Sequence, residues 1–141
     1  MHFTKVLALA CAALLAACSG APRSPVTSAG AGRDWDDYKR QAALRIVQAN
    51  PGQTFAGPLP DPLQSIPVLQ VQLRSDGSVR SITVLRTPKF APQTVEMARQ
   101  AVQRAAPFGP VGHLPQPWQF SETFLYNDDL KFQLRTLAEA P

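Results

Sequence analysis

The chain has 141 residues, 45% of them hydrophobic and 17% charged, a size at which one hydrophobic core serves a single domain. Its formal net charge is only +4, whereas a nucleic-acid-binding protein usually concentrates far more positive charge on one face. This charge argues against a nucleic-acid partner. The 14 prolines, about twice the average usage, predict that loops and extended segments take up much of the chain.

The first 17 residues are typical of a secretory signal sequence. Lys5 supplies a positive charge, the apolar run Val6–Leu15 follows, and small residues come next. A bilayer-spanning helix needs about 20 apolar residues, so this run is too short to be one. We therefore expect residues 1–17 to be a signal peptide that directs export.

Four residues at the end of this segment, Leu15, Ala16, Ala17 and Cys18, resemble the bacterial lipobox. The resemblance implies that the chain is cleaved before Cys18, that Cys18 receives a diacylglycerol thioether, and that its new amino group is acylated, for example with palmitate. Ser19 stands where an Asp would resemble the inner-membrane retention signal. The resemblance thus implies a lipoprotein anchored in the outer membrane and facing the periplasm. The alternative is an ordinary signal peptide in which the cysteine occurs by chance.

The part of the chain that follows the signal peptide offers few groups for catalysis or metal binding. Cys11 lies in the discarded segment and Cys18 is modified, so no disulfide, cysteine–metal site or cysteine nucleophile is expected in the domain. His113 is the only histidine after the signal peptide. Without a second ligand or a nucleophile beside it, we interpret it as an ordinary loop residue. We expect no enzymatic activity, no metal and no cofactor.

Residues 18–33 are predicted to form a lipidated flexible tether, and residues 34–141 the folded domain. Ser, Gly, Ala and Pro dominate 19–33, which has almost no large apolar side chain and cannot bury enough surface to offset its ordering entropy. A tether of this length reaches roughly 20 Å on average and about 50 Å when fully extended. The domain is thus expected to sample the space near the membrane.

The domain is predicted to begin with a helix over Asp34–Ala49. Asp34 is a good N-cap, and Asp36 and Asp37 follow in the first turn, where the helix dipole favours negative charge. We therefore interpret the three acids as capping residues and not as a metal site. Apolar residues recur at helical spacing until Asn50-Pro51-Gly52 ends the helix.

A proline-rich loop over 51–66 follows this helix, and its near-alternate prolines favour extended backbone. Two interpretations stay open. The loop lies over the core through Phe55, Leu59 and Leu63, or it serves as a proline-rich ligand for a partner domain.

The clearest predicted element is a β-hairpin. Alternating apolar and polar residues indicate strands over Val68–Arg74 and Val79–Arg86, and Ser75–Ser78 has the Asp-Gly chemistry of a turn. An apolar stripe predicts a second helix over Pro92–Ala105. A third strand is predicted over Trp118–Tyr126.

The alternation places Glu122 on the same face of this third strand as the apolar residues. Burial of a carboxylate without a partner costs free energy. Either a bulge turns it outward, or it lies at the sheet edge beside an arginine such as Arg80 or Arg86. Beyond the strand, Phe132 and Leu134 indicate a short extended tail.

The order helix, hairpin, helix, strand resembles the C-terminal domain of the TonB and TolA proteins. The similarity is carried by the alternating strands and Asp-Gly turn of Val68–Val84, by Ala98–Pro110 with its Ala-Pro-Phe run, and by Phe120–Tyr126. It implies an α+β fold in which two helices pack on one face of a three-stranded antiparallel sheet. The lipid anchor takes the place of the family's transmembrane helix, so coupling to an inner-membrane motor is not expected.

The resemblance also implies a role in protein interaction. Such domains bind a partner strand along an exposed sheet edge, and a three-stranded sheet has two edges that are open unless covered. The candidate edges are the strand with Val68, Gln70, Gln72 and Arg74 and the strand with Trp118, Phe120, Glu122 and Phe124. We expect a non-catalytic interaction module with an envelope protein as partner. The alternatives are that the proline-rich loop or the C-terminal tail covers the edge, and that the protein is a structural accessory of an envelope transport or secretion complex.

Overall fold

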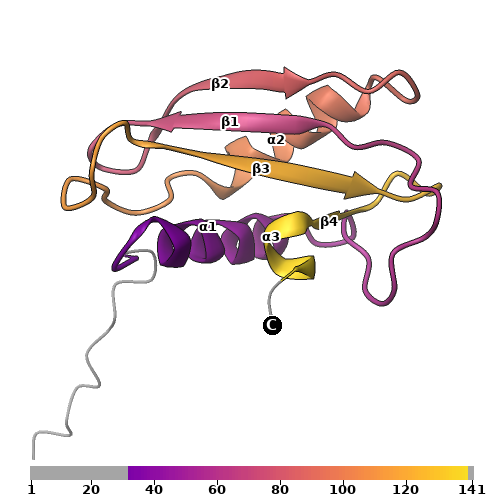
Figure 1. Ribbon diagram of the computed structural model, residues 1–141, viewed down its shortest axis with the longest axis horizontal. Coiled ribbons are helices and arrows are strands. Elements are labelled where there is room, and N and C mark those ends of the chain that lie inside the picture. The colour runs from indigo at the N-terminus through magenta and orange to yellow at the C-terminus, as the bar shows by residue number, and fades with distance from the viewer. Residues whose placement is uncertain (1–31, 140–141) are drawn as a thin grey trace, which may run out of the picture.

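The computed structural model describes residues 32–139. The predicted signal peptide, the lipobox with Cys18 and residues 18–31 of the predicted tether lie outside the described residues. The elements in chain order are α1 (Trp35–Ala49), β1 (Val68–Leu73), β2 (Val79–Arg86), α2 (Thr94–Ala105), β3 (Gln119–Tyr126), β4 (Phe132–Leu134) and α3 (Arg135–Ala138). The strands form an antiparallel sheet in the order β2-β1-β3-β4 (Figure 1).

The hydrophobic core lies between one face of the sheet and the two longer helices. Alternate β1 residues Leu69, Val71 and Leu73 are buried on this face, whereas Gln70 and Gln72 point to the other face and are half-buried. The helices α1 and α2 contact each other and contribute buried residues to the same core. Figure 1 shows α2 behind the strands. The prediction of an α+β fold is confirmed.

Local capping explains where α1 begins and ends. Asp34 is the N-cap, and its carboxylate accepts a hydrogen bond from the Asp37 N–H at 2.8 Å, as predicted. Asn50 ends the helix, and its backbone N–H donates to the Val47 carbonyl at 3.2 Å. The helix α2 begins at Thr94, two residues after the predicted start, because Pro92 and Gln93 belong to the preceding turn.

The predicted β-hairpin is confirmed, with two irregularities in its second strand. Along β1 and β2 the register changes twice, so that Arg80 and Leu85 have no partner residue opposite them and form β-bulges. In the turn, Gly77 has φ +84°, and the loop after α2 lies against it, where the Phe108 N–H donates to the Gly77 carbonyl at 2.9 Å. The hairpin turn is therefore part of the folded body and not a free tip.

The sheet has four strands, so the prediction of three strands is wrong. A turn at Asn127 reverses the chain, because the Asn127 side-chain oxygen accepts from the Asp129 and Lys131 N–H groups at 3.0 Å. The returning segment becomes β4, which pairs with Phe124–Tyr126 of β3. The short helix α3 then follows, and it was not predicted.

The proline-rich loop runs along the β4 side of the sheet. Phe55 and Leu63 are half-buried, as expected for a loop that lies over the core. Contrary to the prediction, Leu59 is 40% exposed and does not join the core. The Phe55 N–H donates to the Phe132 carbonyl at 3.3 Å, and the Tyr126 N–H donates to the Ser65 carbonyl at 2.9 Å. The loop thus covers strand ends and edges and leaves the centre of the core to the helices.

Candidate partner-binding edge of the sheet

The first predicted edge strand is in fact the centre of the sheet. β1 pairs with β2 along one side and with β3 along the other, so Val68, Gln70 and Gln72 do not line an edge. Arg74 lies just beyond β1, and its Nη1 donates to the Val79 carbonyl at 2.8 Å. The prediction for this strand is wrong because α2 crosses the core face and returns the chain beside β1 instead of beside β2.

The second predicted edge strand, β3, is partly covered. β4 pairs with its last three residues, and the Phe132 N–H of β4 in turn donates to the Gln53 carbonyl at 3.0 Å. The C-terminal tail and the proline-rich loop therefore both lie on this side, as the alternative interpretation expected. The predicted binding residues Phe120 and Phe124 are buried in the core, and Trp118 is half-buried with its indole N–H donating to the Leu114 carbonyl at 3.1 Å.

Glu122, the remaining predicted binding residue of β3, is 2% exposed and lies beneath α3. Both expectations for it are wrong, since it is neither turned outward nor paired with Arg80 or Arg86. Its Oε1 accepts from the Thr123 N–H at 3.0 Å and from the Thr136 N–H at 3.3 Å, while its Oε2 has no hydrogen-bond partner. Burial raises the pKa of Glu122 more than the Thr136 side chain, the two N–H groups and the Lys39 charge together lower it.

The open edge of the sheet is β2. The Leu73 N–H donates to the Trp118 carbonyl at 2.8 Å, so the odd-numbered residues of β1 direct their backbone groups to β3 and the even-numbered ones direct theirs to β2. Thr83 pairs with Gln70 and Ser81 pairs with Gln72. The backbone groups of Thr83 and Ser81 therefore face β1. The backbone groups of Ile82 and Val84 face away from the sheet.

A side-chain contact from α2 agrees with this orientation. Arg99 Nη1 donates to the outward-facing carbonyl of Ile82 at 3.3 Å. Beyond β2, no further strand occurs within residues 32–139 (Figure 1). The backbone groups of Val84 and the N–H of Ile82 thus form a ladder edge at which another strand can pair.

The ends of β2 differ from its centre. The bulges at Arg80 and Leu85 interrupt the regular edge, and Arg80 and Arg86 place exposed charges at its two ends. Bulges and charges are devices by which proteins discourage indiscriminate edge-to-edge pairing. The regular stretch between them, residues 81–84, is the segment that remains available. Sequence reasoning passed over β2, although its two arginines are typical of an exposed edge.

A cleft of about 320 Å³ adjoins the C-terminal end of β2. It is lined by Leu63–Ile66 of the proline-rich loop and by Arg86–Phe90 after β2. Phe90 borders the cleft with 75% of its surface exposed, and Arg86 and Lys89 bring two cations to it. An apolar and positively charged cleft therefore lies beyond the C-terminal end of β2, between this strand and the proline-rich loop.

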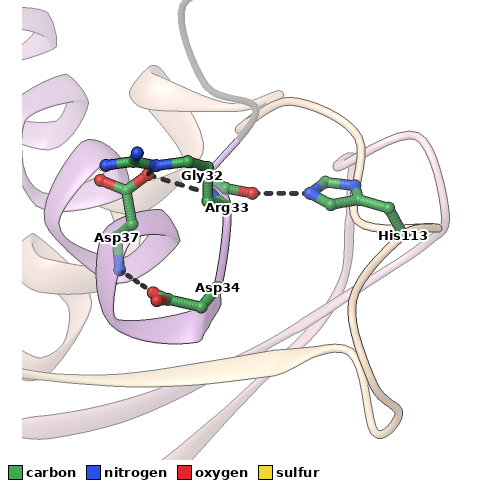
Figure 2. Close-up of polar contacts among 5 residues, drawn as sticks. All are labelled: Gly32, Arg33, Asp34, Asp37 and His113. Atoms are coloured by element: carbon green, nitrogen blue, oxygen red, sulfur yellow. Dashed lines mark hydrogen bonds and ion pairs between the residues drawn. The ribbon is translucent and has the colours of Figure 1, made fainter.

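The acids and the histidine that the sequence singled out lie at the start of the domain, away from this edge. Figure 2 shows Asp34 capping Asp37, and the Asp37 carboxylate accepting from the Arg33 N–H at 3.0 Å. His113 Nε2 lies 2.6 Å from the Gly32 carbonyl oxygen and is therefore the protonated nitrogen in this contact (Figure 2). These contacts fasten the beginning of the domain. Within residues 32–139 no group of three or more potential ligands is suited to hold a metal ion.

An apolar groove of about 440 Å³ lies between α1, the proline-rich loop and β4. Val47, Phe55 and Leu134 are among its lining residues, and none of the described lining residues is ionisable. The groove has the character of a packing or binding surface, and its described lining offers no acid or base. None of the helices within residues 32–139 combines the length and apolarity needed to cross a bilayer.

The chain matches no protein-family model, and neither the curated proteins nor the solved structures compared with it include a match.

Proposed function

We propose that this protein is a periplasm-facing lipoprotein that acts as a non-catalytic interaction module of the cell envelope and binds a partner by strand addition to β2. The observation that carries the proposal is the outward-facing backbone of Ile82 and Val84 at an edge with no neighbouring strand in the described residues. Main-chain groups at such an edge supply affinity, and the flanking side chains select the partner.

The lipobox-like residues Leu15–Cys18 support the location. A diacylglycerol thioether and an amide-linked acyl chain on Cys18 together bury three chains, and two or more chains hold a protein stably at a bilayer. The tether between Cys18 and the first helix then lets the domain search for partners within about 50 Å of the membrane. Ser19 favours the outer membrane over retention in the inner one.

The order of the elements supports a likeness to the TonB and TolA C-terminal domains. A helix, a hairpin, a second helix and a returning strand follow one another in the order on which that resemblance rests. We do not propose energy transduction, because in that family energy transduction depends on a transmembrane helix. Here the predicted lipid anchor takes the place of that helix. The proposed role is that of a docking module.

A site-specific crosslinking experiment in cells tests the proposal. A photoreactive amino acid at Thr83, exposed on β2, is expected to form an adduct with a specific envelope protein, whereas the same probe at Gln103, exposed on α2, is not. Val84→Pro removes an outward-facing N–H and is expected to abolish the adduct while circular dichroism shows the fold retained. An adduct that persists in Val84→Pro, or that forms equally from Gln103, would contradict strand addition at β2.

A further inference from the structure

The positive charge of the domain is concentrated in the segment from the hairpin turn to α2. Residues 74–99 contain five cationic side chains against two acidic ones, whereas the rest of residues 32–139 contains seven against eight. The small net charge of the whole chain therefore conceals a local excess. Its five cations are Arg74, Arg80, Arg86, Lys89 and Arg99.

These cations gather around β2 in space as well as in sequence. Arg80 and Arg86 belong to the strand itself and are exposed. Arg74 and Arg99 reach the strand by donating to the carbonyls of Val79 and Ile82. Of the two acids, Asp76 accepts from Ser78 within the hairpin turn, and Glu96 pairs with Arg99 at 3.4 Å. No acid within β2 balances Arg80 and Arg86.

From this arrangement we infer that the β2 edge receives an extended acidic peptide segment of about seven residues. The inference rests on the proposed function and adds the chemistry of the partner. Arg80 and Arg86 are six residues apart, about 20 Å along a strand, so a partner strand in register carries one carboxylate near each end. Between them, its backbone pairs with the Ile82 N–H and with the backbone groups of Val84.

The cleft beside Phe90 adds a third contact. It continues from the C-terminal end of β2 and is bordered by Ile66 and Phe90 together with Lys89. We expect an apolar side chain of the partner just outside the paired segment to contact the exposed Phe90 at the border of this cleft, near a carboxylate at Arg86. A peptide strand uses the backbone edge, the charges and the cleft together, whereas an anionic lipid surface would use only the charges and Phe90.

Four synthetic peptides test the inference on the full chain, purified in a non-ionic detergent. The first is a seven-residue Thr/Val strand with Glu at both ends, the second and third carry Gln or Lys at those ends, and the fourth is the Glu peptide with alternate N-methylated amides. We expect the Glu peptide to bind about three- to tenfold more tightly than the Gln peptide, since two exposed ion pairs form, and the Lys peptide to bind most weakly. N-methylation is expected to abolish binding because it blocks main-chain pairing.

A charge variant of the protein completes the test. Arg80→Gln combined with Arg86→Gln is expected to make the Glu and Gln peptides bind equally, while Arg40→Gln combined with Lys131→Gln, exposed cations elsewhere, keeps the preference. Raising the salt concentration to about 0.5 M is expected to reduce the preference as well.

The outcomes separate the two proposals. Equal binding of the Glu, Gln and Lys peptides, lost on N-methylation, would overturn the acidic partner and leave strand addition intact. No binding by any peptide, or undiminished binding of the N-methylated one, would overturn both. If the amide resonances of residues 81–90 respond to phosphatidylglycerol in the micelles and to no peptide, the surface is a lipid-contacting one and the acidic strand is refuted.

Discussion

The Thr136 N–H at the first turn of α3 donates to the buried carboxylate of Glu122 on β3 at 3.3 Å. The N-cap residue of α3, Leu134, has no side chain that can cap the helix, so Glu122 supplies an acceptor from another element. The contact is incomplete, because Glu122 Oε2 is buried without a hydrogen-bond partner. Glu122 thus joins the C-terminal segment to the sheet at a cost in desolvation.

This burial predicts a pH dependence of stability. Because the pKa of Glu122 is raised above its ordinary value of 4.5, the folded state binds the proton more tightly than the unfolded state. Its contribution to stability is fully present below pH 4.5 and is lost as the pH rises through the raised pKa. Within that window, the free energy of unfolding of the wild type is expected to fall relative to Glu122→Gln by up to about 1.4 kcal/mol per pH unit. Urea unfolding from pH 4 to pH 8 measures the difference.

Glu139→Gln is the matched control, because Glu139 is an exposed carboxylate of the same C-terminal segment, 3.3 Å from Arg135. Its stability is expected to follow that of the wild type across the pH range within about 0.5 kcal/mol. A pH-independent difference between Glu122→Gln and the wild type would show that Glu122 does not titrate with a raised pKa.

Replacing Asn50 with an apolar residue is expected to cause a large loss of stability. The side chain is 1% exposed, and its Nδ2 donates to the Ile46 carbonyl at 2.7 Å and to the Ala101 carbonyl at 3.0 Å, joining the end of α1 to α2. Its Oδ1 accepts from Arg104 at 3.1 Å. Asn50→Leu leaves these groups without partners and is expected to lower the free energy of unfolding by about 2–3 kcal/mol in chemical denaturation. Gln48→Leu, exposed on the same helix, is expected to change it by less than about 0.5 kcal/mol.

The two longer helices and the hairpin were predictable because their signals are local. Asp34 and the Asn50-Pro51-Gly52 stop lie within a few residues of the backbone groups that they govern. The Asp-Gly turn likewise sets the hairpin without help from distant residues. By contrast, β4 has three residues, too few for an alternation to be recognised, although it pairs with the strand immediately before it through the turn at Asn127.

The candidate edge was assigned to the wrong strands for a related physical reason. Alternation shows that one face of a strand is buried, and it is strongest in a strand that the helices cover fully, such as β1 with Val71 and Leu73. A covered central strand is the opposite of an edge. The true edge, β2, has a weaker pattern because only Ile82, Val84 and Val79 are half-buried. Burial patterns carry information about faces, whereas strand order depends on the path of α2.

Gly77 and Gly52 provide a matched test of the contact between the hairpin turn and the loop after α2. Both have positive φ, +84° and +77°, which is unfavourable for alanine by about 1–2 kcal/mol. At Gly77 an added Cβ would also overlap the Gly109 carbonyl, while at Gly52 it would meet open space. Gly77→Ala is therefore expected to destabilise the protein by at least about 2 kcal/mol more than Gly52→Ala, measured by thermal unfolding. Equal effects would mean that the loop moves away at little cost.

The two cysteines allow the lipid anchor to be tested against a control within the same segment. If Cys18 carries the acyl groups, Cys18→Ala is expected to abolish the incorporation of radiolabelled palmitate and to release a folded protein into the soluble periplasmic fraction. Cys11 is predicted to be discarded with the signal peptide, so Cys11→Ala is expected to leave labelling and outer-membrane fractionation unchanged. A Cys18→Ala protein that still fractionates with the outer membrane would contradict anchoring by lipid. Because the β2 edge and the adjoining cleft belong to the folded domain, their binding of a peptide strand is expected to be the same in the released and the anchored protein.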